Sequence, residues 1–162
     1  MKKILLARFS LITFIVLFLF NLAKAQEADY PEQRALAQSL VDEAVELIQT
    51  KGEDALLMIE DENGKFNTPD TYVFITSESG ADLVNPAFRD IEGLPLENYT
   101  EPTSKDAQMT IVNAVKDKDT AWVEYLWPRP KETKPSRKIS YLRKIIVNGK
   151  VRIVGAGFYP HN

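Results

Sequence analysis

The segment "ISYLRKIIVNGKVRIVGAGF", residues 139–158, decides the fold of this chain. Two runs rich in β-branched residues flank Asn148-Gly149, the dipeptide that best fits the left-handed backbone angles of a two-residue hairpin turn. Such a turn fixes the register of its strands, and side chains then alternate between the two faces. The sequence therefore predicts an antiparallel hairpin whose strands cover about 137–147 and 150–159.

In this register, Tyr141 and Arg143 share one face of the hairpin. The opposite face is apolar and carries Gly155 and Gly157, whose missing side chains suit close approach of a helix. We therefore expect Tyr141 and Arg143 to point away from the long N-terminal helix. A desolvated arginine needs a partner. Two partners stay open: an acidic residue of segment 86–102, or a ligand carboxylate, which matches the planar guanidinium.

The rest of the chain adds helices before and between further strands. Helices are indicated by apolar residues at three- and four-residue spacings, and strands by β-branched and aromatic runs. The predicted elements are helices at 34–49, 53–60 and 104–116, a hairpin at 71–76 and 81–85, and a strand at 121–127. This order predicts an α+β domain in which an antiparallel sheet carries a long helix on one face.

The stretch "AWVEYLWPRP", residues 121–130, holds both tryptophans of the chain. On a strand, Tyr125 and Trp127 share a face by two-residue alternation. Each combines apolar area with a polar atom that needs a hydrogen bond, which suits the wall of a ligand cavity. Packing in the core is the alternative for either residue taken alone.

The first 25 residues have the three parts of a secretory signal peptide. A positively charged start precedes an apolar run at 11–20, and Ala23-Lys24-Ala25 forms a small-x-small cleavage site. A retained membrane anchor is the alternative, but a spanning helix needs roughly 20 apolar residues. We therefore expect cleavage to leave residues 26–162 as one soluble domain, periplasmic or secreted, without stable membrane insertion.

Composition excludes several classes of function. Residues 26–162 carry 16 Lys and Arg against 23 Asp and Glu, a net charge of −7, which is unfavourable for nucleic acid. The chain has no cysteine, and its one histidine is His161 near the end, so thiolate chemistry and histidine-based catalytic or metal clusters are not expected. The sequence predicts neither an enzyme nor a cofactor or metal site.

Four stretches together resemble a known family. "TYVFITSESGADLVNP" (71–86), "AWVEYLWPRP" (121–130), "ISYLRK" (139–144) and "IVGAGFYP" (153–160) are similar, in order and spacing, to the single Cache domain. This is the extracytoplasmic sensing module of bacterial chemoreceptors and histidine kinases. The resemblance implies a PAS-like sheet of five antiparallel strands, with the long helix on one face and a pocket for a small molecule, often a short organic acid, on the other.

The resemblance also implies which residues bind the ligand. Carried onto this sequence, the pocket positions are Tyr72, Phe74, Asn85, Tyr125, Trp127, Tyr141 and Arg143. Asn85 departs from a common pattern of the family, in which a histidine often stands before the proline found here at position 86. The identity of the ligand is therefore open.

These observations predict an exported domain that captures a small organic carboxylate at Arg143. No second apolar segment follows the signal peptide, so we expect a separate membrane-bound sensor kinase or chemoreceptor to read the bound state. The alternative is a periplasmic interaction protein that docks on such a sensor kinase or chemoreceptor and needs no ligand.

Overall fold

The structure is a computed structural model that describes residues 30–68 and 71–160. The predicted signal peptide and His161 lie outside the described residues. Within the described part, no helix is both long enough and apolar enough to cross a membrane. The helices are α2 (Pro31–Lys51), α3 (Asp54–Glu60) and α4 (Pro102–Ala114), with single 3₁₀ turns at Arg89–Ile91 and Leu96–Asn98; the strands are β1 (Tyr72–Ser77), β2 (Asp82–Val84), β3 (Thr120–Pro128), β4 (Pro135–Val147) and β5 (Lys150–Phe158).

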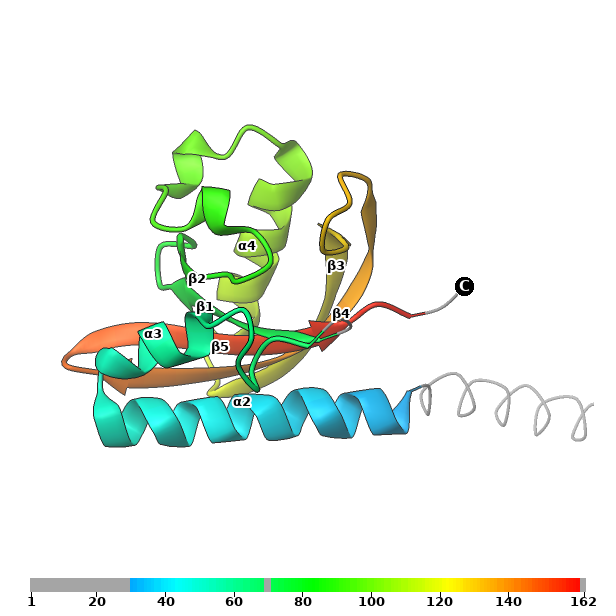
Figure 1. The fold of residues 1–162 in the computed structure, drawn as a ribbon. Coiled ribbons are helices and arrows are strands. Elements are labelled where there is room, and N and C mark those ends of the chain that lie inside the picture. The colour runs from blue at the N-terminus through cyan, green and yellow to red at the C-terminus, as the bar shows by residue number, and fades with distance from the viewer. Residues whose placement is uncertain (1–29, 69–70, 161–162) are drawn as a thin grey trace, which may run out of the picture. The chain divides into compact units, whose positions relative to one another are not determined.

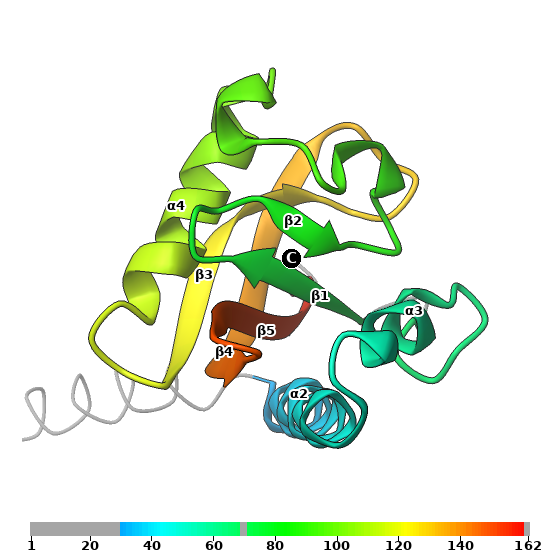
Figure 2. The same cartoon turned by 90° about the vertical axis from the view of Figure 1, so that its left-hand side faces the viewer.

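The five strands form one antiparallel sheet in the order β2-β1-β5-β4-β3. The register predicted from the Asn-Gly turn is confirmed, because Val147 pairs with Lys150 and Arg143 pairs with Val154. Figures 1 and 2 show α2 along one face of this sheet, and α4 with the connecting loops on the other. The predicted PAS-like α+β architecture, with a long N-terminal helix on one sheet face, is confirmed.

The face that α2 covers is a filled apolar core. The buried stripe of α2 packs against alternate side chains of β1, β4 and β5. These strand residues, each less than a tenth exposed, are Val73, Ile75, Tyr141, Ile145, Val147, Val154 and Ala156. Burial of these apolar groups attaches α2 to the sheet.

The prediction that Tyr141 and Arg143 point away from the long helix is wrong. Arg143 Nη1 donates to Asp42 Oδ1 of α2 at 2.8 Å, and the Tyr141 ring lies 5.2 Å from that of Trp122 on the same face. The sequence pattern gives the wrong face because Gly155 does not make room for α2. A Cβ there would lie 2.3 Å from Cζ of Phe74, so the glycine makes room for an aromatic ring on the opposite face.

Candidate ligand-binding site

A small cavity lies on the sheet face opposite α2, between the sheet and α4. Its lining residues are Tyr72, Phe74, Asp82, Asn85, Gln108, Ile111, Tyr125, Trp127 and Lys138. The volume of the cavity is only about 10 Å³. That is close to the room one water needs. An acid of two or three carbons therefore fits only if the surrounding side chains move outward.

Strand alternation places the aromatic wall of this cavity. Tyr72 and Phe74 project from β1, and Tyr125 and Trp127 project from β3, two residues apart in each case. Phe88, from the segment after β2, packs edge-on against Trp127 at 5.6 Å between ring centroids. The structure thus brings together five of the seven residues predicted for the site, namely Tyr72, Phe74, Asn85, Tyr125 and Trp127.

The other two predicted residues lie elsewhere. Arg143 and its partner Asp42 have side chains that are 38% and 45% exposed, on the α2 side of the sheet. Tyr141 belongs to the core on that side. Neither partner considered for Arg143 from the sequence, an acid of segment 86–102 or a ligand in a cavity, matches this geometry.

The cavity has a different cation, Lys138 of β4, which is not among the residues predicted from the sequence. Its side chain is buried, and Nζ lies 3.9 Å from the centre of the Tyr72 ring, within cation–π distance. Among the described residues, no carboxylate lies within 4.0 Å of this ammonium. Burial lowers the pKa of Lys138 to about 7, and the charge of Asp82 opposes that shift. A cation in this position favours an anionic ligand.

Asp82 of β2 is the buried acid of the site. Its Oδ1 accepts a hydrogen bond from Thr76 Oγ1 at 3.0 Å, and its Oδ2 accepts one from Asn85 Nδ2 at 2.9 Å. Burial raises the pKa of Asp82 to about 6, while these donors and the charge of Lys138 hold it down. Above pH 6 both carboxylate oxygens are therefore occupied acceptors.

Three polar atoms on the cavity wall lack a partner. Among the described residues, Tyr72 Oη, Asn85 Oδ1 and Trp127 Nε1 are buried and make no hydrogen bond, although the Tyr72 hydroxyl lies near that of Tyr159. Each buried unpaired group costs about 1–3 kcal/mol. Tyr125 differs, because its hydroxyl pairs with Ser140 Oγ at 2.9 Å. The wall thus offers two donor groups and one acceptor to a small polar ligand.

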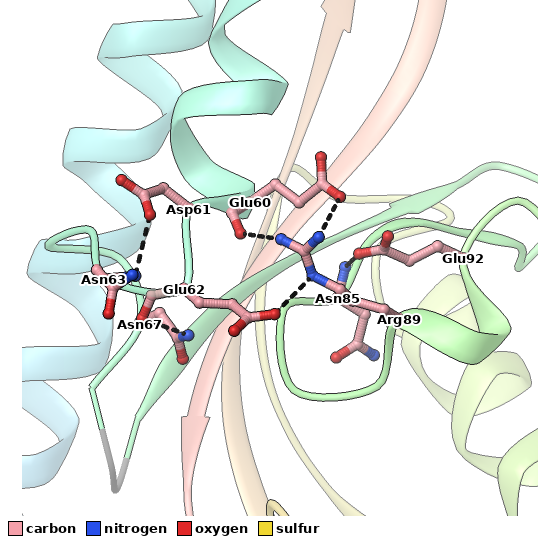
Figure 3. Close-up of polar contacts among 8 residues, drawn as sticks. All are labelled: Glu60, Asp61, Glu62, Asn63, Asn67, Asn85, Arg89 and Glu92. Carbon is pink, nitrogen blue, oxygen red and sulfur yellow. Dashed lines mark hydrogen bonds and ion pairs between the residues drawn. The ribbon is translucent and has the colours of Figure 1, made fainter.

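The segment that carries Asn85 is fixed by charged residues, which Figure 3 shows. Arg89 donates from Nη2 to the carbonyl oxygen of Glu60 at 2.8 Å and pairs through Nε with Glu62 at 3.1 Å. The backbone N–H of Asn85 donates to the Glu92 carboxylate. These contacts tie the start of the long loop to the end of α3, and hold Asn85 at the cavity.

A family model described as "Cache domain" matches residues 37–162, and the chain belongs to this family. The prediction of a Cache domain is confirmed.

Several solved sensor domains have a similar fold. One is a Cache chemosensory domain studied for carboxylic acid recognition, with 21% identity, TM-score 0.59, and coverage of 87% of this chain and 97% of that one. Another is the periplasmic sensor domain of a chemotaxis protein, with 24% identity, TM-score 0.58, and coverage of 86% and 98%. A third is a methyl-accepting chemotaxis protein from Vibrio parahaemolyticus, with 14% identity, TM-score 0.67, and coverage of 86% and 96%.

Proposed function

We propose that this protein is a sensor domain that captures a short organic acid in the cavity between the sheet and α4. The observation that carries the proposal is Lys138, a buried cation without a carboxylate in ion-pairing distance among the described residues. Burying a charge is unfavourable unless it is paired, and the carboxylate of a ligand supplies the missing charge.

The roles of the other side chains follow from their chemistry. Tyr72 Oη and Trp127 Nε1 donate to the ligand carboxylate beside Lys138, and Phe74 and Ile111 cover the short apolar part. Burial raises the pKa of Tyr72, so its hydroxyl keeps its proton and stays a donor at neutral pH. Tyr141 and Arg143 are not part of the proposed site, because they face α2.

In this proposal the domain is exported by its N-terminal signal peptide. A membrane-bound sensor kinase or chemoreceptor then reads the bound state. Support comes from the similar solved domains, which include the periplasmic sensor domain of a chemotaxis protein and a Cache domain studied for carboxylic acid recognition. The proposed role is ligand binding without catalysis.

A thermal-shift screen of short organic acids at pH 6.5 tests the binding function. A ligand at 100 times its dissociation constant stabilises the folded protein by about 2.7 kcal/mol, which raises the melting temperature. Propionamide, which has the shape of propionate but no charge, is the matched control and is expected to give no shift. The absence of a shift with every acid, or equal shifts with propionate and propionamide, would contradict the proposal.

A further inference from the structure

The orientation of the Asn85 side chain is fixed by its neighbours. Its Nδ2 donates to Asp82 Oδ2 at 2.9 Å, and Asp82 Oδ1 already accepts from Thr76. An ionised carboxylate only accepts hydrogen bonds, so the amide nitrogen of Asn85 must face Asp82. The carbonyl oxygen Oδ1 is consequently the group of Asn85 left for another partner.

This oxygen is an acceptor that no plain carboxylate can satisfy. Asn85 is 3% exposed and lines the cavity, and among the described residues its Oδ1 has no donor. The carboxylate and alkyl chain of acetate or propionate bring no hydrogen-bond donor. Either acid would leave Oδ1 buried and unpaired in the complex, which is unfavourable.

We infer that Asn85 makes the site selective for short acids that carry a hydroxyl group on the second carbon, that is, 2-hydroxy acids. The inference rests on the proposed function, because it assigns the ligand of the same cavity. In this arrangement the carboxylate lies against Lys138, and the hydroxyl donates to Asn85 Oδ1. The small volume of the cavity favours the smallest acids of this class, such as glycolate and lactate.

A 2-amino acid also carries a donor on the second carbon, but its charged ammonium group has to be stripped of water to enter the site. Its ammonium group would be a second buried cation, and the nearby Asp82 carboxylate already accepts a hydrogen bond on each oxygen, from Thr76 and from Asn85. A neutral hydroxyl avoids that desolvation penalty. The cavity therefore favours lactate over alanine, although the two molecules have nearly the same shape.

Calorimetric titration at pH 7 with propionate, lactate and alanine tests this selectivity, since the three differ only at the second carbon. We expect lactate to bind roughly tenfold more tightly than propionate, the effect of one added hydrogen bond to a buried group. Equal affinities, or tighter binding of propionate or alanine, would overturn the inference while leaving the proposed function standing. Binding of none of the three would remove the proposed function and the inference together.

Two variants then assign the selectivity to Asn85. Asn85→Leu removes the acceptor and is expected to bring the ratio of lactate to propionate affinity close to one. Trp127→Phe is the matched control, because it removes a donor to the carboxylate that both acids share, and should weaken both while keeping their ratio. A ratio that persists in Asn85→Leu would overturn the role of Asn85. If Asn85→Leu does not fold, Asn85→Ala, which also lacks an acceptor, is titrated in its place.

Discussion

The two cations of β4 that matter here lie on opposite faces of the sheet and differ in what surrounds them. Arg143 is partly exposed beside α2 and pairs with Asp42 at 2.8 Å. Lys138 is buried beside the cavity, and no carboxylate of the described residues lies within 4.0 Å of it. The first cation has its partner within the fold. The second is the cation to which the proposed function assigns the ligand carboxylate.

The same contrast holds for the two faces as a whole. On the α2 face the side chains of β5 fill the space, as Ala156 and Val154 do in the apolar core. On the cavity face Gly155 and Gly157 leave space that neighbouring side chains occupy. One face therefore loses stability when an atom is removed, and the other when an atom is added.

The largest expected effect on stability tests this contrast directly. A Cβ at Gly157 would lie 2.1 Å from Ser140 Oγ and 2.6 Å from the backbone oxygen of Ile139, so the backbone itself has to move. We expect Gly157→Ala to lower the free energy of unfolding by about 3 kcal/mol in urea denaturation. Ala156→Gly, on the α2 face, should lower it by about 1 kcal/mol through the lost methyl group. A Gly157→Ala variant as stable as the unchanged protein would contradict the packing described for the cavity face.

A smaller effect concerns the pH dependence of stability. The pKa of Lys138 is about 7 in the folded protein, against an ordinary value of 10.5, so between these values the unfolded chain binds more protons. The free energy of unfolding contributed by this group therefore rises with pH above 7, by about 2 kcal/mol between pH 7 and pH 9. Urea denaturation at the two pH values should show the rise in Arg143→Met and its loss in Lys138→Met. Identical pH profiles in the two variants would show that Lys138 is not the titrating group.

The smallest expected effect is that of the exposed ion pair. Arg143→Met removes the contact with Asp42, whose carboxylate stays in contact with solvent. Exposed ion pairs contribute up to about 1 kcal/mol, so the free energy of unfolding should fall by no more than that. A double-mutant cycle with Asp42→Asn isolates the contribution of the pair. A coupling energy well above 1 kcal/mol would mean that the pair of Arg143 and Asp42 stabilises the fold more than an exposed ion pair does.

Much of the fold could be predicted because the signals for it are local. The Asn148-Gly149 turn sets the pairing of β4 and β5 through its own backbone angles, and strand alternation then gives the two faces. Which of those faces meets α2 depends on contacts between residues far apart in the sequence. The two glycines of β5 were consistent with either arrangement, and the prediction chose the wrong one.

Part of the site could also be predicted from the sequence. Resemblance to the Cache family indicated Tyr72, Phe74, Asn85, Tyr125 and Trp127, which the structure brings together around the cavity. Lys138 was missed because a lysine near the start of a strand is usually exposed. Only the aromatic rings of Tyr72, Phe74 and Tyr159, which are far away in the sequence, enclose it. The signal available in the sequence was strand alternation, which places Lys138 and Ser140 on the face opposite Tyr141.

The affinity for a short acid in two matched variants tests the central claim, that Lys138 rather than Arg143 is the cation of the binding site. Lactate or propionate, whichever binds the unchanged protein more tightly, is titrated calorimetrically into Lys138→Met and into Arg143→Met. We expect Lys138→Met to weaken binding by about 100-fold or more, because the ligand carboxylate loses its buried counter-charge, and Arg143→Met to change it less than about twofold. Loss of binding in Arg143→Met, with binding retained in Lys138→Met, would contradict the account.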